Sequence, residues 1–403
     1  MLFNLKELTM EKEIRIGIIG LGKRGRSIFR CVLQKMEGVK VVALCDNYFD
    51  RTQDILKFLK EDGKDEGVLC TTDYNEVLNY PGLDCVYIAC SWETHCEVAI
   101  AALKKGIPVA CEVGGAYNLE ECYELVKVYE ETKTPIMFME NCYYNKIEMT
   151  LFNMADDNFF GDIVYCSGAY GHDLREEVAR GVEKRHYREN NYLHRNCENY
   201  PTHELGPIAR LLKINRGNRF TTLFSASSCA KGMEEYVKAN KKPHDEVLEG
   251  KSFAQGDIVT TLITCEDGSL IQLKLDTTLP RSYSRELHVA GTKARYTQLY
   301  DEVFIDGDDE MKKSKSLDEY SQYRPEIWNE ENEAIIKERG HGGMDWLVFE
   351  DFFKHLRENK PMPIDVYDMV ALMAVTPLSE ISIKEQRVVE YPDFTNGAYK
   401  TRK

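Results

Sequence analysis

The chain has 403 residues, with 67 acidic and 52 basic side chains and a formal net charge of −15 at pH 7. The length suits two or three domains, and a composition of 43% hydrophobic and 30% charged residues is typical of a globular rather than a disordered protein. The acidic balance argues against a general binder of nucleic acid or of an anionic membrane, because both need a basic surface. We therefore expect a small-molecule or glycan substrate that is neutral, or that is held by a local basic pocket.

Cysteine usage and hydropathy indicate a cytoplasmic protein. No apolar run approaches the roughly 18 residues that a membrane span needs, and residues 1–13 show no secretory hydrophobic segment. The 13 cysteines are an odd number without a Cys-x-x-Cys pair, and several, such as Cys45 and Cys111, lie in apolar runs. This pattern predicts buried, reduced thiols. Metal-ligand spacing is missing from the sequence, so we expect no metal site.

The first third of the chain alternates short apolar runs with stretches that carry apolar residues at helical spacing. This alternation predicts βαβ units and a parallel sheet. The predicted strands cover residues 14–19, 39–45, 85–90, 109–111 and 136–139, and the predicted helices cover 27–37, 51–61, 95–105 and 119–132.

The pattern changes from about Gly161 onward. Ile271, Leu273 and Leu275 alternate with polar residues, as in a strand with one buried face and one wet face. Similar strands are predicted at 162–170, 220–227, 257–265 and 285–290, helices at 202–213, 344–358 and 366–384, and polar loops or insertions at 231–256 and 301–330.

A glycine-rich motif, Gly20-Leu21-Gly22-Lys23-Arg24-Gly25, follows the first predicted strand and opens a helix. In this context glycines allow a tight turn and bring a dinucleotide pyrophosphate close to backbone amides. Asp46 ends the second strand, where a carboxylate accepts hydrogen bonds from ribose hydroxyls and repels a 2′-phosphate, so NAD is favoured over NADP. The alternatives are a glycine-rich turn without a ligand, with Lys23 and Arg24 as ordinary surface charges.

Together these patterns predict the fold class. We expect an α/β Rossmann domain over residues 1–145 and an α+β C-terminal domain with an open, mostly antiparallel sheet over residues 146–403. The C-terminal helix of the second domain could pack back on the first.

The segment Trp92-Glu93-Thr94-His95 follows the strand predicted at 85–90 and begins a helix. The carboxyl edge of a parallel sheet is where such sheets bind ligands, which makes this segment a candidate for cofactor contact. Alternatively, Thr94 is a helix N-cap and Trp92 a packing residue.

Glu112-Val113-Gly114 follows the strand predicted at 109–111, and with it the N-terminal third resembles the Gfo/Idh/MocA oxidoreductase superfamily. Enzymes of that superfamily usually carry Glu-Lys-Pro here, and the lysine assists proton transfer from the substrate hydroxyl. Val113 can neither donate nor accept a proton, so a standard sugar dehydrogenase is disfavoured.

A narrower resemblance, to glycoside hydrolase family 109, covers nearly the whole chain beyond the first dozen residues. Its type activity is an NAD-dependent α-N-acetylgalactosaminidase. The matching blocks are Glu112-Val113, Glu140-Asn141-Cys142-Tyr143, Gly168-Ala169-Tyr170, Tyr200-Pro201-Thr202-His203, Leu205-Gly206-Pro207, Ile214-Asn215-Arg216-Gly217, Gly340-His341-Gly342-Gly343-Met344-Asp345, Asp365-Val366-Tyr367-Asp368, Val375-Thr376-Pro377-Leu378-Ser379-Glu380 and Pro392-Asp393-Phe394.

The resemblance implies a set of site residues. Lys23, Arg24 and Asp46 would hold the pyrophosphate and adenosine ribose of NAD, next to Gly20, Gly22 and Gly25. The nicotinamide half would be surrounded by Trp92, Glu93, Thr94, His95, Glu112, Val113 and Asn141. The sugar would contact Tyr170, Arg188, Tyr200, Pro201, Thr202, His203 and Tyr283. From the residues alone, His203 could equally be a structural histidine, the tyrosines could merely pack, and Arg188 could be solvated. No role is predicted for His341 beyond that of a loop residue between glycines.

The implied reaction is hydrolysis through transient oxidation. The sugar loses hydride at C3, the resulting ketone acidifies C2–H, the C1 leaving group is eliminated, water adds at C1, and hydride returns to C3. His203 is predicted to move the C3 hydroxyl proton, and Tyr170 or a neighbouring tyrosine the C2 or leaving-group proton. The alternatives are an NAD-dependent sugar or cyclitol dehydrogenase and a non-catalytic NAD- or sugar-binding regulator. Since the superfamily usually pairs through its C-terminal sheet, a homo-oligomer, dimer or tetramer, is expected.

Overall fold

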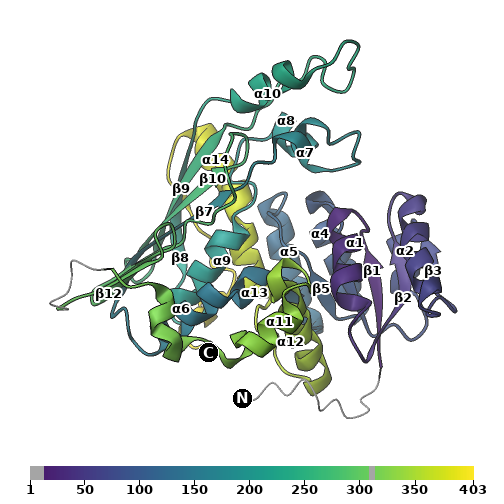
Figure 1. Cartoon of the computed structure of the whole chain (residues 1–403), viewed down its shortest axis with the longest axis horizontal. Helices are drawn as coiled ribbons and strands as arrows, with labels where there is room; N and C mark the ends of the chain where they lie inside the picture. The colour runs from purple at the N-terminus through teal and green to yellow at the C-terminus, as the bar shows by residue number, and fades with distance from the viewer. Residues whose placement is uncertain (1–12, 308–313) are drawn as a thin grey trace. The chain divides into compact units, whose positions relative to one another are not determined.

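The computed structural model describes residues 13–307 and 314–403, which form two compact units (Figure 1). Unit 1 contains the chain up to Val113, Glu120–Lys146 and Pro325–Met369, and unit 2 contains Gly114–Leu119, Ile147–Arg324 and Val370–Lys403. Pro325–Met369 thus folds with the first unit, although a division at residue 145 assigns it to the second domain. The predictions for residues 1–12 and 308–313 lie outside the described residues.

Unit 1 is built on a six-stranded parallel sheet of order β3-β2-β1-β4-β5-β6. The strands are β1 (Ile14–Ile19), β2 (Val39–Cys45), β3 (Leu69–Thr71), β4 (Cys85–Ile88), β5 (Val109–Cys111) and β6 (Ile136–Phe138). The four strands β1, β2, β4 and β5 are almost wholly buried, as in a parallel sheet covered on both faces. The sequence prediction of a Rossmann-type sheet is confirmed, but it missed β3 and the short helix α3 (Tyr74–Leu78), which are too short to show a period.

The first helix begins earlier than predicted. α1 covers Lys23–Ile28 and continues as a π-helical turn, η1, over Phe29–Leu33, so the helix opens directly from Gly22. The other helices and helical turns of unit 1 are α2 (Phe49–Glu61), α4 (Trp92–Lys104), α5 (Leu119–Thr132), η2 (Asn141–Tyr144), η4 (Glu326–Trp328), α11 (Glu330–Ile336), η5 (His341–Gly343) and α12 (Met344–Glu358).

Helix α12 belongs to the core of unit 1, although it follows β1 by more than 300 residues in the sequence. Phe349 and Phe352 of α12 are fully buried, and the Phe349 ring packs edge-on against Tyr87 of β4 with centroids 5.1 Å apart. Burial of aromatic side chains of this size stabilises a fold by about 1.5–3 kcal/mol each. This packing explains why Pro325–Met369 joins unit 1.

Unit 2 is built on an eight-stranded sheet of order β13-β12-β11-β7-β10-β9-β8-β14. Its pairs are antiparallel except β7 with β10, so the predicted mostly antiparallel sheet is confirmed. The strands are β7 (Ile163–Gly171), β8 (Phe220–Ser227), β9 (Ile258–Cys265), β10 (Leu270–Asp276), β11 (His288–Gly291), β12 (Ala294–Thr297), β13 (Glu302–Ile305) and β14 (Val389–Glu390). The predicted strand over 285–290 begins only at His288.

The helices of unit 2 are α7 (Arg175–Ala179), α8 (Arg188–His194), α9 (Thr202–Leu211), α10 (Gly232–Asn240) and α14 (Val375–Glu385), with the turns η3 (Leu317–Tyr323) and η6 (Ala398–Lys400). Helices α9 and α14 pack against this sheet, whereas α7, α8 and α10 lie near one end of it (Figure 1). A Cβ at Gly168 of β7 would lie 2.8 Å from the Cβ of Glu204, so this glycine allows α9 to pack closely. The segments 231–256 and 301–330, predicted as loops, contain α10, β13, η3 and η4.

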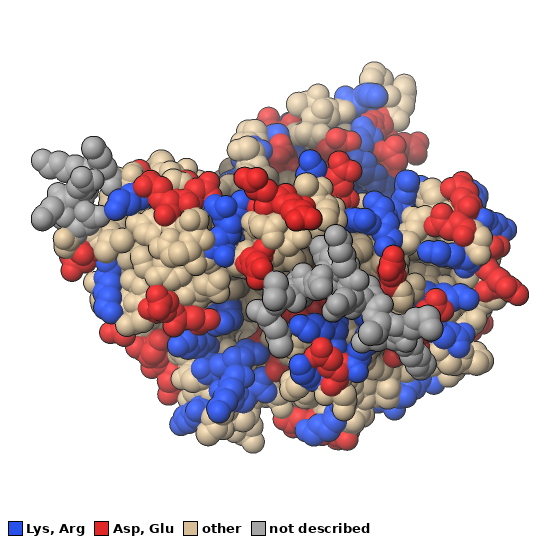
Figure 2. Space-filling view, turned by 60° about the horizontal axis from the view of Figure 1, so that its bottom comes forward, with Lys and Arg blue, Asp and Glu red and all other residues tan. Residues whose placement is uncertain are grey.

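The opposite face of the sheet is exposed among the described residues. Phe224 of β8 and Leu262 of β9 are directly paired on this face, and each is apolar and 37% exposed. Elsewhere on the molecule, acidic and basic side chains are interspersed on the face shown in Figure 2. Apolar side chains that are exposed together on a sheet are typical of a surface that contacts another molecule.

The helices α6 (Lys146–Asp156) and α13 (Val366–Met373) cross from one unit into the other along the chain. α13 and α14 together form the stretch Val366–Glu385, which is long and apolar enough to cross a membrane by length and composition. The sequence analysis predicted a helix over 366–384 but counted no apolar run long enough to span a membrane. Within its most apolar window 78% of the residues are buried inside the protein, as in the core helix of a globular fold.

Candidate functional site

In unit 1 the glycine-rich loop between β1 and α1 can be built only with glycine at two positions. Gly20 has φ +97°, and a Cβ there would lie 2.4 Å from the backbone of Ala89 and Cys90. A Cβ at Gly25 would lie 2.0 Å from the carbonyl oxygen of Gly20. Gly22 is the N-cap of α1, and Lys23 lies in the first turn. The loop is therefore a tight strand-to-helix turn of the kind that brings backbone amides to a pyrophosphate.

Asp46 lies at the end of β2, beside this loop. Its carboxylate accepts hydrogen bonds from the backbone amides of Leu21 at 2.7 Å and Tyr48 at 2.9 Å, and Nη1 of Arg51 lies 3.4 Å from both oxygens. The two amides fix the carboxylate in one orientation at the position predicted for the ribose. A fixed acceptor of this kind fits the adenosine end of NAD.

Arg24 forms ion pairs with two carboxylates, which the sequence analysis did not predict. Its Nε donates to Glu112 at 2.9 Å, and Nη1 and Nη2 donate to Asp345 at 2.8 and 2.9 Å as a bidentate pair. Burial alone would lower the pKa of the guanidinium, but Glu112 and Asp345 together raise it well above its usual value. The resemblance assigns Arg24 to the pyrophosphate, whereas its guanidinium here joins the glycine loop to Glu112 and Asp345.

Asp345 is the centre of this network and is completely buried. It accepts a hydrogen bond from Nδ2 of Asn141 at 2.7 Å, and Nδ1 of His341 lies 2.7 Å from its Oδ2. Burial would raise the pKa of the Asp345 carboxyl, but Arg24 and His341 hold it well below its ordinary range. Asp345 is a functional candidate that the sequence prediction missed, although it ends the Gly-His-Gly-Gly-Met-Asp block.

His341 differs from the other members of the network because its side chain is 57% exposed. It has φ +42° and lies between Gly340, Gly342 and Gly343, all of which have positive φ. The imidazole therefore projects from an unusual backbone turn while a buried carboxylate fixes its Nδ1 edge. A histidine held in this way is suited to proton transfer.

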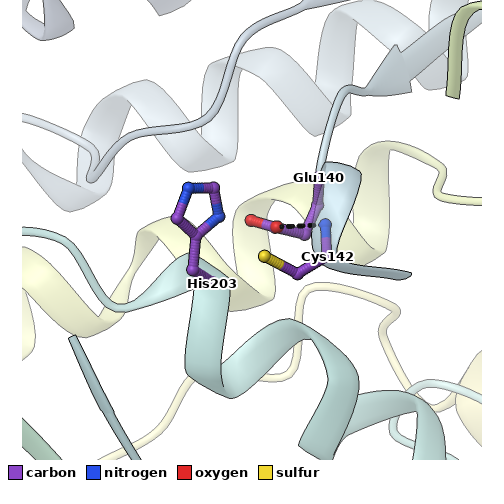
Figure 3. A group of neighbouring side chains, drawn as sticks. All are labelled: Glu140, Cys142 and His203. Carbon is purple, nitrogen blue, oxygen red and sulfur yellow. Dashed lines mark hydrogen bonds between the residues drawn. The ribbon is translucent and has the colours of Figure 1, made fainter. Parts of the chain in front are cut away.

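The remaining predicted nicotinamide residues lie in the same unit. Glu112 is buried and accepts from the hydroxyl of Tyr87 at 2.8 Å and from the backbone amide of Val113 at 3.3 Å. Figure 3 shows Glu140 accepting a hydrogen bond from the backbone amide of Cys142, at 3.0 Å, across the turn that carries Asn141. This bond sets the backbone that presents Asn141 to Asp345.

The segment Trp92–His95 forms the first turn of α4. Its N-cap is Ser91, not Thr94 as the packing interpretation supposed, and the Thr94 hydroxyl donates back to the carbonyl of Ser91 at 3.1 Å. Trp92 and His95 are buried, whereas Glu93 and Thr94 are partly exposed. Burial lowers the pKa of His95 to about 4, so this imidazole is neutral at pH 7.

In unit 2, three of the predicted sugar residues form one aromatic cluster. The ring centroids of Tyr170 and Tyr200 are 4.5 Å apart, those of Tyr200 and His203 are 5.0 Å apart, and the Tyr200 hydroxyl lies 3.4 Å from Nε2 of His203. The Tyr170 hydroxyl lies 3.2 Å from Nδ1 of His172. Burial raises the pKa of Tyr170 to about 12, although Arg188 opposes this rise.

Arg188 completes this cluster. Its guanidinium lies 5.1 Å from the centroid of the Tyr200 ring, and its Nη1 donates to Glu177 at 3.2 Å. Burial would lower the pKa of Arg188, but Tyr170, Tyr187 and Glu177 raise it well above its usual value. The solvated alternative for Arg188 is therefore wrong, because its side chain is buried.

Hydrogen bonds to α14 hold the segment that precedes His203. His203 lies in the first turn of α9 (Figure 3). The N-cap of this helix is Pro201, and Thr202 is fully buried. The backbone amide of Glu198 donates to the Ser379 hydroxyl, and its carbonyl accepts from Thr376, both at 2.8 Å. These bonds to α14 hold the chain just before Tyr200, and burial raises the pKa of the Glu198 carboxyl well above its usual value.

Tyr283 is the outermost of the predicted sugar residues, with 51% of its surface exposed. Its ring meets His172 edge-on at 5.4 Å and Tyr170 at 6.5 Å. The structure thus gathers Tyr170, Arg188, Tyr200, His203 and Tyr283 in unit 2. Sequence reasoning missed Glu177 and His172, which lie in no block singled out for the site.

Comparisons with known proteins agree with this division. Residues 14–139 match the model of the oxidoreductase family with an NAD-binding Rossmann fold, and residues 144–401 match the C-terminal domain of glycosyl hydrolase 109. Relatives include a glycosyl hydrolase family 109 protein of Stenotrophomonas maltophilia, 35% identical over 97% of this chain and 91% of the relative. Another is an alpha-N-acetylgalactosaminidase of Tannerella forsythia, 34% identical over 96% of this chain and 87% of the relative.

Solved structures share the fold at low identity. A myo-inositol 2-dehydrogenase from Lactobacillus plantarum superposes with a TM-score of 0.67 at 18% identity, covering 94% of this chain and 100% of that one. A scyllo-inositol dehydrogenase from Lactobacillus casei, with bound NAD(H) and scyllo-inositol, gives 0.66 at 16% identity, covering 94% and 99%.

The fold and the site residues define an enzyme with an NAD-binding Rossmann domain and a separate α+β domain. The family match is specific within that class, because it covers most of the second domain and the relatives match along nearly the whole chain. The chain belongs to glycosyl hydrolase family 109.

Proposed function

We propose that this enzyme hydrolyses α-linked N-acetylgalactosaminides by transient oxidation of the sugar at C3. The observation that carries the proposal is the cluster of Tyr170, Tyr200 and His203 around a buried arginine, in the domain that matches the family model. Aromatic faces and planar donors suit sugar hydroxyls and an acetamido group. The name of the Tannerella forsythia relative supports this substrate.

The residues of unit 1 fit NAD. The loop at Gly20 and Gly25 leaves no room for side chains, and Asp46 presents a fixed carboxylate for ribose hydroxyls. When bound, NAD⁺ supplies a reversible acceptor for the C3 hydride, so that the net reaction is hydrolysis. Glu112 and Asn141, which are held by Tyr87 and Asp345, would position the nicotinamide end.

In unit 2, His203 would take the proton of the C3 hydroxyl, because imidazole is a common general base and the Tyr200 hydroxyl, 3.4 Å from Nε2, orients the ring. Loss of hydride and of this proton gives a 3-keto sugar, whose C2–H is acidic. A base then removes the C2 proton, the C1–O bond breaks, and the electron pair leaves with the aglycone. Water adds at C1, the C2 proton returns, and reduction at C3 restores the sugar.

Two groups are candidates for the C2 and leaving-group protons. Tyr170 is the first, but burial raises its pKa to about 12, so its hydroxyl stays protonated at pH 7 and is a weak acid. His341 is the second, since Asp345 fixes its Nδ1 edge and its ring is largely exposed. Because Asp345 contacts Nδ1, the other ring nitrogen, Nε2, is the atom that would donate the proton. We favour His341 for the leaving-group proton on this ground.

A first experiment separates hydrolysis from dehydrogenation. Purified enzyme, without added cofactor, is incubated with aryl N-acetylgalactosaminides, and phenol release and absorbance at 340 nm are followed together. Phenol without accumulating NADH supports the proposal. Stoichiometric NADH would instead show a sugar dehydrogenase, as the fold of the inositol dehydrogenases allows. Neither signal across a broad glycoside panel would favour a non-catalytic regulator.

A second experiment assigns the protons. His203→Ala should abolish turnover while the variant still binds NAD, and loss of NAD binding would place His203 with the cofactor instead. A variant that lacks the leaving-group acid loses more activity on methyl glycosides than on activated aryl glycosides, since only the poor leaving group needs the proton. We expect this difference for His341→Ala and not for Tyr170→Phe. The reverse pattern would assign the role to Tyr170.

We also propose a cytoplasmic location and a homo-oligomeric state. All 13 cysteines are free thiols, and Cys229 is exposed, which suits a reducing compartment. The apolar sheet face of unit 2 at Phe224 and Leu262 supports self-association.

A further inference from the structure

The buried arginine of the sugar cluster is paired with a carboxylate inside unit 2. Nη1 of Arg188 donates to Oε1 of Glu177 at 3.2 Å, and Nε2 of His186 lies 3.5 Å from the same oxygen. The side chains of Arg188 and Glu177 are only 11% and 16% exposed. A charge-assisted bond in such a position is weakly screened by water.

The pair is held by the helices that carry it. Glu177 lies on α7 and Arg188 on α8, and Lys251, which follows α10, joins the two. The ammonium group of Lys251 donates to the carbonyl of Ala179 at 2.7 Å and forms a buried ion pair with Glu189. Glu189 also accepts from the backbone amide of Val182 at 2.6 Å. The position of Glu177 relative to Arg188 is therefore built into the fold.

The charge of this pair decides which sugars the cluster can hold. A buried guanidinium alone attracts a carboxylate or sulfate strongly, because two opposite charges interact over several ångströms in a medium of low dielectric constant. With Glu177 beside it, Arg188 still offers planar N–H donors to hydroxyl and acetamido oxygens. An anionic substituent, however, would meet a neutral pair and the repulsion of the Glu177 carboxylate. The pair thus recognises polar neutral groups and rejects negative ones.

We propose that Glu177 is a specificity-determining residue that restricts this enzyme to neutral N-acetylhexosaminides and excludes acidic or sulfated ones. The inference rests on the proposed function, because it places the sugar at Arg188. It adds a residue and a substrate property: the charge of the sugar is selected by a carboxylate that does not itself need to touch it.

The test compares binding of two sugars to the whole chain at pH 7. N-acetylgalactosamine and the corresponding uronic acid, which differ only in the oxidation state of C6, are titrated by ligand-observed NMR. For the wild type we expect the neutral sugar to bind at least about tenfold more tightly than the uronate. Glu177→Gln should reduce this ratio by about tenfold or more, mainly by tightening the uronate. A thermal melt checks that the variant is folded.

Two further variants separate local from general effects. Glu176→Gln removes the same charge from the same helix, but its side chain is 68% exposed and pairs with Lys184, so its ratio should match that of the wild type. Glu177→Asp keeps the charge and should retain the preference for the neutral sugar even if Glu177→Gln is poorly folded. An unchanged ratio in Glu177→Gln, an equal fall in Glu176→Gln, or no binding of either sugar would overturn the inference. Because binding is read without turnover, failure to cleave glycosides would refute the proposed reaction and leave this result standing.

Discussion

Arg24→Met tests the charge network of unit 1 most directly. In the wild type, one guanidinium compensates two buried carboxylates, those of Glu112 and Asp345, at 2.8–2.9 Å. Removing one partner of a buried ion pair costs about 3–5 kcal/mol, because the remaining charges stay out of water without compensation. For a unit of this size we expect a fall of about 6–20 °C in the midpoint of thermal unfolding. Arg24→Met/Asp345→Asn should recover part of it.

Tryptophan fluorescence reports this loss selectively, because all three tryptophans, at positions 92, 328 and 346, belong to unit 1. The pKa of Asp345 is lower in the folded chain than its ordinary value of 3.8. The stability that it gains is therefore fully present above about pH 4 and is lost as the pH falls further. The difference between wild type and variant should be largest near neutral pH and shrink as the pH falls, because protonation of the carboxylates relieves the uncompensated charge in the variant.

The matched control is Arg26→Met on the same helix. Arg26 lies 3.7 Å from Asp54 in an exposed pair, with side chains 47% and 41% exposed, so its loss should leave the unfolding midpoint almost unchanged. Two results would show that the network does not stabilise unit 1 in this way. One is an unfolding midpoint that Arg24→Met lowers no more than Arg26→Met does. The other is a midpoint that falls further, rather than partly recovering, when Asp345→Asn is added.

Three other predictions concern separate parts of the chain. Gly25→Ala should prevent NAD binding and destabilise unit 1, because the new Cβ would lie 2.0 Å from a carbonyl oxygen. Gly22→Ala should fold normally, because the atom nearest to its Cβ, Nη1 of Arg51, is 3.6 Å away. Equal melting midpoints for the two variants would contradict this prediction. Burial lowers the pKa of His95 from 6.5 to about 4, so between these values the unfolded chain binds more protons than the folded one. The free energy of unfolding should therefore decrease as the pH falls through this interval, by up to about 1.4 kcal/mol per pH unit. His95→Asn should abolish this slope in unfolding followed by fluorescence. If the chain self-associates through this sheet face as proposed, Phe224→Asp combined with Leu262→Asp should lower the mass measured by light scattering to that of a monomer. An oligomer of unchanged mass would show that this face is not the interface.

Much of the fold could be predicted because strong periods mark it. The strands Ile14–Ile19 and Val39–Cys45, and the helix Met344–Glu358, have the predicted bounds, since each is a continuous apolar run or a long amphipathic one. The short strands Leu69–Thr71 and Val389–Glu390 each contain a polar residue and form through pairing with a neighbouring strand, so they leave neither an apolar run nor a period in the sequence.

The site divides in the same way. The glycine loop and Asp46 could be predicted because their roles follow from local backbone geometry, and the sugar residues came from the resemblance of whole motifs. Glu177 could not be predicted, because its role depends on Arg188, which lies on a different helix. Asp345 acts on Arg24 across 321 residues of sequence, a pairing that only the packing of α12 in unit 1 creates.

The valine at position 113 changes how proton transfer must be organised. A lysine at that position, next to Glu112, would supply both a positive charge and a titratable group. Here the positive charge beside Glu112 comes from Arg24, which stays protonated and therefore cannot exchange a proton with a sugar. Val113 is buried and contributes neither charge nor proton. Charge compensation beside Glu112 thus comes from a group that cannot transfer a proton, and in the proposed reaction that task falls to His203 and His341. If Val113→Lys created NADH release from free sugars, that separation would be the feature that distinguishes this hydrolase from the dehydrogenases sharing its fold.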